Sequence, residues 1–555
     1  MKRKNGMMRL RVATLFVMLL VSCLGLFGQA TTTSSIVGQV TDSTQAAIPG
    51  ADVTLTDLST KIAHTASTNE SGRYIFTNVD PGTYSLTIVK QGFAKSEIPS
   101  QPVEVGSTLT LNFKMELGTS TTTIEVRAVS GAELQTTNAA VGTTIGGDAL
   151  ASLPNFGRDV TTLSVIQPGT TLGGFTAGAY SDQNTYTLDG GNNSDDMGGN
   201  VTGYVQNFTG LGGTQQNGNP SGVMPTPVES IEEIKVNSFN QTADFNSSIG
   251  GQVVMATKRG TNQFHGSGYG YYFDTAFGAA NTWVADHTPF HGLPYTPLVS
   301  NHRTRYGFSI GGPITTKKFL GGKTYFFFNL EDLRFPNSGT YEHLVPTAAM
   351  RAGVIQVPLA SSAGGAYVPY NLNSFAVTVP GVNNGQPIAP AGCAILGCDP
   401  RGLGLNPIVN QIWTKYMQLP NDPLYGSGDG YNTEGYLSTI RAPLTSNNYV
   451  ARIDHDFSDK WRFYSSYRDQ KLINLTTNQV DIGGAIGSDK FGVPTALAPR
   501  PQQPDFFVTG LTTNISPTVT NTFVFNYIRN FWQWSDNSSA QIPGLGLGGA
   551  LEIGG

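Results

Sequence analysis

Charged side chains are scarce in this chain of 555 residues, of which only 13% are Asp, Glu, Lys or Arg. The formal net charge is −5 and no long block of Lys or Arg occurs, so the basic surface that nucleic-acid binding requires is missing. The metalloprotease motif H-E-x-x-H and the phosphate-loop motif G-x-x-x-x-G-K-[ST] are also absent. We therefore expect no enzyme, no catalytic residues, no cofactor and no nucleic-acid partner.

Cysteine is rarer still, with Cys23 near the N-terminus and Cys393 and Cys398 spaced C-x4-C. A structural metal site usually needs four ligands, and no second Cys/His pair with suitable spacing lies nearby, so no metal site is predicted. In an exported chain, two such cysteines favour a small loop-closing disulfide between Cys393 and Cys398.

A long apolar run occurs only at the N-terminus, where basic residues precede Val12–Phe27 and Gly28-Gln29-Ala30 follows. This layout predicts a secretory signal peptide over residues 1–30. The alternative is lipoprotein processing, with the lipid on Cys23. No later segment offers a helical membrane span, so a membrane form of this chain would have to be a closed β-barrel.

Glycine, with 67 residues, and aromatic residues, with 10%, are abundant. Over residues 34–117, short runs alternate between apolar and polar residues and are separated by turns containing Pro and Gly, which predicts a small antiparallel β-sandwich. The expected strands are Ile36–Val40, Ala51–Leu55, Tyr74–Phe76, Tyr84–Ile88 and Leu109–Phe113.

Two stretches of this segment, VGQVTDSTQAAIPGADVTLTD and TNESGRYIFTNVDPGTYSLTIVKQGF, resemble the carboxypeptidase-regulatory-like, transthyretin-like module. The resemblance implies a seven-stranded accessory domain without catalytic residues of its own. Asp57, His64, Asp80 and Glu97 are accordingly expected at the surface and in turns.

A Thr-rich linker follows at residues 118–129, and its sequence TTTIEVRA resembles the TonB box of outer-membrane receptors. An exposed extended segment can pair with the sheet edge of a partner through backbone hydrogen bonds. The alternative is an ordinary linker or strand edge. The resemblance implies that a periplasmic TonB-type energy-transducing protein binds Thr123, Ile124, Glu125, Val126 and Arg127.

Residues 130–260 contain TYTLDGG, VESIEEIKV and IGGQVVMATKRGTN, in that order. These sequences resemble the plug domain of TonB-dependent receptors, which implies an α+β plug with a short helix at Gly147–Leu153. The plug would end at a plug-to-barrel connection, expected to be a hinge rather than a ligand site, made of Lys258, Arg259, Gly260, Thr261 and Asn262. Four aspartates could bind calcium, but their spacing fits no EF-hand loop and favours a solvated plug loop: Asp182, Asp189, Asp195 and Asp196.

The pattern after Thr261 is typical of antiparallel barrel strands. Tyr269, Tyr271 and Phe273 fall on alternate positions, and Gly268 and Gly270 precede the first two, as expected of a strand with one apolar face. Tyr306, Phe308 and Ile310 share one strand face, and Arg305, Gly307 and Ser309 share the other. Two hairpins are expected, one from Asn448–Phe457 and Trp461–Leu472, the other from Phe506–Asn514 and Thr520–Arg529.

A long loop region is expected at residues 336–445, within the barrel segment 261–555. It should contain two short amphipathic helices, in VPTAAMRAG and NPIVNQIWTKYMQLPNDP. In the second, core packing is favoured over ligand contact for the residues at helical spacing, which are Ile408, Ile412, Tyr416 and Leu419.

The predicted fold is mainly β: a transthyretin-like sandwich, an α+β plug and the N-terminal part of an antiparallel transmembrane β-barrel. The series is similar to the Oar-like branch of TonB-dependent receptors. A complete barrel of that family has 22 strands, whereas residues 261–555 allow about ten, so we expect a fragment or a truncated gene product.

The resemblance implies an outer-membrane receptor and transporter in a Gram-negative cell envelope. It would be embedded in outer-membrane lipid and take up a small polar ligand, such as a glycan or a metal chelate. The ligand-binding residues are unknown. Two alternatives are a structural or adhesive outer-membrane protein without transport, and a secreted hydrolase.

Overall fold

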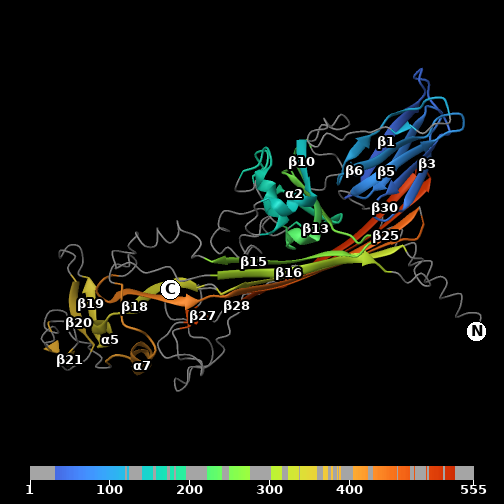
Figure 1. The fold of residues 1–555 in the computed structure, drawn as a ribbon. Coiled ribbons are helices and arrows are strands. Elements are labelled where there is room, and N and C mark those ends of the chain that lie inside the picture. The colour runs from blue at the N-terminus through green and yellow to red at the C-terminus, as the bar shows by residue number, and fades with distance from the viewer. Residues whose placement is uncertain are drawn as a thin grey trace, which may run out of the picture.

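The computed structural model describes four parts of the chain: a sandwich, a plug, a barrel sheet and a loop module (Figure 1). The described residues are 32–118, 122–123, 141–153, 158–171, 175–179, 183–194, 222–240, 249–274, 302–314, 323–336, 338–358, 367–372, 377–378, 384, 387–388, 404–422, 429–458, 460–475, 480–481, 495–496, 499–516, 519–529 and 531.

The N-terminal sandwich is built from two sheets with strand orders β4-β1-β7, to which β8 adds beside β1, and β3-β2-β5-β6-β9. Alternate residues of each strand point between the sheets, where Ile36, Leu55, Leu86 and Ile98 are at most 1% exposed. The strands are β1 Ser34–Thr41, β2 Asp52–Asp57, β3 Ala63–Ser67, β4 Arg73–Val79, β5 Gly82–Val89, β6 Ser96–Val103, β7 Thr108–Thr110, β8 Phe113–Lys114 and β9 Thr122–Thr123.

The sandwich prediction is confirmed, with two strands that the sequence pattern missed. β3 is the edge strand of its sheet, and its residues are exposed or half-buried throughout, so apolar alternation could not reveal it. β6 contains Pro99 and Pro102, and its buried residues do not follow a strict alternation. The expected last strand is divided between β7 and β8, which both pair with β1.

The plug has one mixed sheet with the strand order β10-β13-β14-β11-β12. Its strands β11 and β14 are parallel, and every residue of both is buried, as expected for strands covered on both faces. The elements are β10 Val141–Gly146, α2 Gly147–Ser152, η2 Val160–Ile166, β11 Thr185–Leu188, β12 Gly191–Asn192, η5 Val228–Ser230, β13 Ile231–Phe239 and β14 Gln252–Thr257.

The barrel sheet is antiparallel, with the order β15-β16-β17-β24-β25-β29-β30 and β28 beside β25. It confirms both predicted hairpins, β24 with β25 and β29 with β30. The plug lies on one face of this sheet, here called the inner face (Figure 1). The strands are β15 His265–Asp274, β16 His302–Pro313, β17 Thr324–Phe335, β24 Leu444–Asp456, β25 Trp461–Leu475, β28 Pro499–Gln502, β29 Asp505–Ser516 and β30 Val519–Arg529.

The aromatic face expected for β15 points inward, toward the plug. Tyr269 is opposite Gly307 and Tyr271 is opposite Arg305, which places these rings on the inner face. Tyr269 Oη donates to Glu331 at 3.0 Å, and the Arg158 guanidinium of the plug lies 4.3 Å from the Tyr271 ring centre. The face assignments in β16 hold, since Tyr306, Phe308 and Ile310 are at least 40% exposed on the outer face.

The loop module lies at the end of the barrel sheet remote from the sandwich (Figure 1). It confirms both predicted helices, and Ile412 and Tyr416 pack as expected, whereas Ile408 and Leu419 are 41% and 55% exposed. Its elements are β18 Ser338–Pro346, α5 Ala348–Arg351, β19 Val354–Pro358, β20 Tyr367–Asn371, β21 Val377–Thr378, β22 Pro387–Ile388, α7 Pro407–Lys415 and β23 Thr433–Arg441. A short pair, β26 Val480–Asp481 and β27 Thr495–Ala496, follows β25.

Candidate functional site: the junction of sandwich, plug and barrel sheet

The segment Lys258–Asn262, predicted as the plug-to-barrel connection, lies between β14 of the plug and β15 of the barrel sheet. On its plug side, Lys258 N donates to Ser230 O at 3.0 Å. A Cβ atom on Gly260 would lie 2.4 Å from Phe326 O and 2.7 Å from Gly312 O. Only glycine therefore lets the connection approach the backbones of β17 and β16 this closely.

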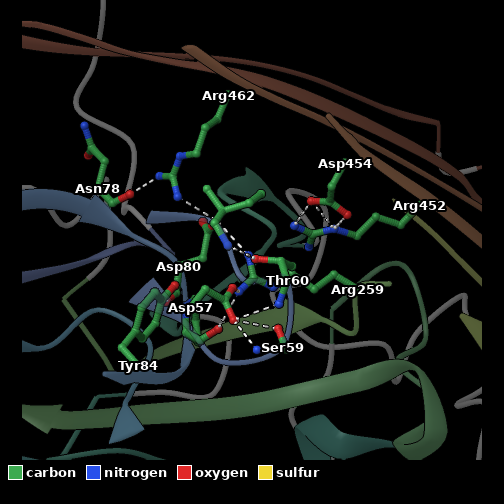
Figure 2. A network of polar contacts seen from close by, with 12 residues as sticks. Asp57, Ser59, Thr60, Asn78, Asp80, Tyr84, Arg259, Arg452, Asp454 and Arg462 are labelled. Carbon is green, nitrogen blue, oxygen red and sulfur yellow. Dashed lines mark hydrogen bonds and ion pairs between the residues drawn. The ribbon is translucent and has the colours of Figure 1, made fainter. Parts of the chain in front are cut away.

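Arg259 joins this connection to the N-terminal sandwich (Figure 2). Its Nη2 donates to Asp57 Oδ2 and its Nη1 to Asp80 Oδ2, both at 2.9 Å. The two side chains at the first contact are 19% and 6% exposed, so this ion pair is largely shielded from solvent. Charge-assisted hydrogen bonds in such surroundings are stronger than those between neutral groups.

The barrel wall contributes a second arginine to the same cluster (Figure 2). Arg462 of β25 donates from Nη1 to Asp80 Oδ2 at 2.8 Å and from Nη2 to Asn78 O. Asp80 thus bridges an arginine of the connection and an arginine of the wall. We call Asp57, Asp80, Arg259 and Arg462 the junction cluster.

The exposed placement expected for Asp57 and Asp80 is wrong, since both carboxylates are in the junction cluster, but their placement at turns is right: Asp57 ends β2 and Asp80 lies between β4 and β5. Asp57 is 4% exposed. Burial opposes the charged form of each carboxyl, but the facing arginines outweigh it and lower both pKa values. Ser59 and Thr60 also lower the pKa of Asp57 by donating hydrogen bonds to it. Both groups are therefore ionised at neutral pH.

A second contact joins the sandwich to the plug strand β13. Glu233 Oε2 accepts from Val105 N at 2.8 Å, and Lys235 Nζ donates to Gly106 O at 2.8 Å. Burial raises the pKa of Glu233 to about 7. Beside these polar contacts, Val105 packs with Val254 and Ala256 of β14.

Asp189 attaches the plug to the barrel wall, which overturns its expected place in a solvated loop. Its side chain is 1% exposed, and its Oδ1 accepts from Arg452 Nη1 at 3.0 Å. Thr257 donates to the same carboxylate from N at 2.8 Å and from Oγ1 at 2.6 Å. Tyr464 Oη donates to Asp189 O at 2.6 Å. The other three aspartates of the proposed calcium group lie outside the described residues.

Buried arginines strengthen this attachment beside Asp189. Arg452 also binds Asp454, at 2.8 Å from Nη2. Arg468 is 1% exposed and donates to Ser230 Oγ at 3.1 Å and to Thr257 Oγ1 at 2.7 Å. Three barrel-wall side chains on β24 and β25 thus converge on three plug residues, Asp189, Ser230 and Thr257, through directed polar contacts.

Of two other sets of predicted site residues, the structure describes one in part and the other not at all. Of the TonB-box-like residues, Thr123 lies in β9, whose backbone pairs in parallel with β6 through Ser96↔Thr122 and Glu97↔Thr123. Ile124, Glu125, Val126 and Arg127 lie outside the described residues. So do Cys393 and Cys398.

Signs of catalysis or metal binding are few in the part of the chain that the structure describes. The described residues contain no group of three or more His, Cys, Asp or Glu that could hold a metal ion. Gly307-Phe308-Ser309-Ile310-Gly311 has the spacing of a nucleophile elbow, G-x-S-x-G, but it lies within β16 rather than at a strand-to-helix turn. No described helix is long and apolar enough to cross a membrane.

Local sequence patterns contained little indication of the junction cluster. Its charges lie in turns and at strand ends, where charged residues are ordinary, and their meaning depends on how the parts dock. Asp189 carried a stronger signal, because it is a single acid directly after a buried strand in the plug-like sequence TYTLDGG.

The sequence matches two families. Residues 256–553 match the outer membrane β-barrel domain, and residues 35–116 match the carboxypeptidase regulatory-like domain. The chain is also 25% identical over 329 residues to the TonB-dependent transporter Oar of Myxococcus xanthus. That alignment covers 57% of this chain and 28% of the relative, so the chain spans little more than a quarter of the relative's length.

Two solved structures show similarity over much of the chain. The siderophore receptor PirA of Acinetobacter baumannii is 13% identical, with a TM-score of 0.35, over 70% of this chain and 39% of that one. The ferric enterobactin receptor PfeA of Pseudomonas aeruginosa is 11% identical, with a TM-score of 0.35, over 70% of this chain and 41% of that one.

The barrel-domain match covers more than half of the chain, and the sandwich match precedes it in the expected order. The order sandwich, plug and barrel sheet agrees with both matches. The chain belongs to the outer membrane β-barrel domain family, carries an N-terminal carboxypeptidase regulatory-like domain, and is similar to the TonB-dependent transporter Oar.

Proposed function

We propose that this protein is an outer-membrane receptor that takes up its ligand by energised transport. In this proposal, a periplasmic TonB-type protein pulls the segment 121–128, and the plug rearranges within the barrel to open a path. The observation that supports it best is the plug seated on the inner face of the barrel sheet and attached there through Asp189 and Arg452. The plug also packs against Phe506 and Val508 of β29, and an interface that combines such packing with a few directed contacts can switch between two packings.

The outer face of the barrel sheet supports a location in outer-membrane lipid. Large apolar and aromatic side chains are exposed along it, among them Phe308, Ile453, Phe523, Phe525 and Tyr527. Residues 1–30 would direct export as a cleaved signal peptide, and Cys393 and Cys398 would form a disulfide in the loop region. The ligand is proposed to be small and polar, such as a glycan or a metal chelate.

The test alters the TonB-box-like segment in the full-length protein. Deletion of 121–128 should abolish uptake of the transported compound and leave its binding to the cell surface intact. A panel of labelled ferric siderophores and oligosaccharides supplies the probes. Unimpaired uptake after the deletion would contradict energised transport, and an adhesion phenotype that the deletion leaves unchanged would favour the structural or adhesive alternative.

A single substitution gives a sharper version of the same test. Val126→Pro removes a backbone N–H and disfavours strand pairing with a partner, whereas Val126→Thr keeps both the N–H and the β propensity. Binding of a purified periplasmic TonB-type domain should be lost in the first variant and retained in the second. Equal binding by both variants would argue against strand addition at this segment.

A further inference from the structure

The sandwich contacts the plug-to-barrel connection at two residues, Arg259 and Asn262. Besides the Arg259 ion pairs, Asn262 N donates to Ser59 O at 3.2 Å and Asn262 Nδ2 donates to Thr60 O. Tyr325 Oη of β17 donates to Asn262 Oδ1 at 3.2 Å. The connection is therefore enclosed between the β2–β3 turn of the sandwich and the barrel wall.

The β2–β3 turn of the sandwich is held by hydrogen bonds within the turn, which do not involve Arg259. Asp57 Oδ1 accepts from Ser59 N and Ser59 Oγ, both at 2.7 Å, and from Thr60 N at 3.3 Å. These bonds occupy one carboxylate oxygen and leave Oδ2 for Arg259. The turn thus presents a fixed acceptor, which reduces the conformational entropy lost when the arginine binds.

The sandwich also contacts the barrel wall directly. Arg462 of β25 shares Asp80 Oδ2 with Arg259 and in addition donates to Asn78 O, a contact in which the connection takes no part. If the connection alone moved, the sandwich would remain attached to β25 while Arg259 left its two carboxylates. The contact of Arg462 with the sandwich is thus the fixed attachment, and the contact of Arg259 with Asp57 and Asp80 is the one that can be released.

The contact is suited to release because it is mainly polar. A cavity of about 560 Å³ lies at the junction, and its lining includes His64, Tyr84, Arg259, Asp456 and Phe523. The two carboxylates and two guanidinium groups of the junction cluster balance in charge. The small apolar group of Val105, Val254 and Ala256 lies at the separate plug contact.

We propose that the N-terminal sandwich is a clamp that closes on the plug-to-barrel connection, anchored on β25 by Arg462 and holding Arg259 with Asp57 and Asp80. The connection can move only after these carboxylates release Arg259. The sandwich therefore acts as an intramolecular partner that controls the mobility of the connection, independently of which ligand the receptor takes up.

Hydrogen–deuterium exchange of the full-length protein in detergent micelles tests the clamp without any transport measurement. In the double variant Asp57→Asn, Asp80→Asn, the amides of residues 258–262 should exchange at least ~10-fold faster than in the unaltered protein. The reason is that Arg259 loses both of its charged partners. Asparagine still accepts from Ser59 and Thr60, so the turn persists. Strands β2, β5 and β24 should be unchanged.

The matched control is Asp52→Asn, which alters an exposed aspartate on the same strand β2. Its side chain accepts a hydrogen bond from Ser67 Oγ at 3.2 Å and is not part of the junction cluster. This control should leave the exchange of 258–262 unchanged. Unchanged exchange in the double variant, or an equal rise in the control, would overturn the clamp.

A reversible cross-link covers the case in which the double variant fails to fold. Ser59→Cys with Asn262→Cys places two thiols on backbones that are hydrogen-bonded to each other, within the range that a disulfide spans. Oxidation should slow exchange of 258–262 relative to the reduced protein, because it prevents release. Equal exchange in both forms would mean that the contact never opens, and the clamp proposal would be wrong.

Discussion

Replacement of Asp189 should weaken the attachment of the plug to the barrel by an amount that depends on the substitution. Asp189 has φ of 50°, a conformation that Asn tolerates well. Asp189→Asn therefore tests the charge without straining the turn. The amide oxygen can still accept from Thr257 N, and Arg452 keeps its contact with Asp454 at 2.8 Å.

The structure allows the two costs to be compared. Loss of the carboxylate charge alone should cost about 1–3 kcal/mol, the usual range for a hydrogen bond to a charged group that is not fully orphaned. Asp189→Ala also removes both acceptors of Thr257 and should cost about 3–5 kcal/mol, as expected when a buried partner is deleted. Asp189→Ala should thus weaken the attachment of the plug clearly more than Asp189→Asn does.

Native-state hydrogen exchange of β11 and β14 measures this difference, with barrel strand amides as the internal reference. Because about 1.4 kcal/mol corresponds to a tenfold change in an equilibrium constant, Asp189→Asn should speed plug exchange about 5- to 150-fold. Glu232→Gln on β13, for which the structure describes no ion pair, is the control. Unchanged exchange in Asp189→Asn, or equal effects of the Asn and Ala variants, would refute the reasoning.

Three further predictions concern the connection and its charges. Gly260→Ala should displace the connection from β16 and β17 at a cost of about 1–3 kcal/mol from overpacking, seen as faster proteolysis near Asn262, whereas Gly268→Ala, which has no atom within 4 Å of the added Cβ, should not. The pKa of Glu233 is raised to about 7 from 4.5, so its contribution to the sandwich–plug contact is complete below about pH 4.5 and is lost as pH rises through 7; Glu233→Gln should abolish that pH dependence in exchange experiments on β13. The pKa values of Asp57 and Asp80 are lowered from 3.8, so their stabilising effect is present above that value and is lost on acidification through the lowered pKa values. The sandwich–connection contact, followed by cross-linking between positions 59 and 262, should therefore weaken as the pH is lowered. Asp57→Asn should remove part of this pH dependence.

Much of the fold followed from local patterns. Period-two alternation located both barrel hairpins, because one face of each strand is turned toward the inner side of the sheet, where the plug lies, and the other face is exposed on the outer side. Turn sequences bounded the sandwich strands, since Pro and Gly favour tight turns wherever they occur. β3 escaped detection because, at the edge of its sheet, it buries no residue fully and so shows no apolar alternation.

The orientation of β15 could not be predicted in the same way. Alternation divides a strand into two faces, but it does not say which face is inside. Tyr269 and Tyr271 face inward, where Tyr269 donates a hydrogen bond to Glu331 and the Tyr271 ring contacts the Arg158 guanidinium. The register with β16 places glycines of β15 on the outer face beside Tyr306 and Phe308.

The sequence by itself determined the order of the parts, the strands of the barrel sheet and the position of the connection, since these depend on residues close together in the chain. Tertiary structure alone decided which charged residues pair with each other. Asp57 and Arg259 are 202 positions apart, and Arg462 and Asp80 are 382 apart. Ion pairs over such separations form only when separate parts dock, because the free energy of each pair depends on its partner's position and on the water excluded around it.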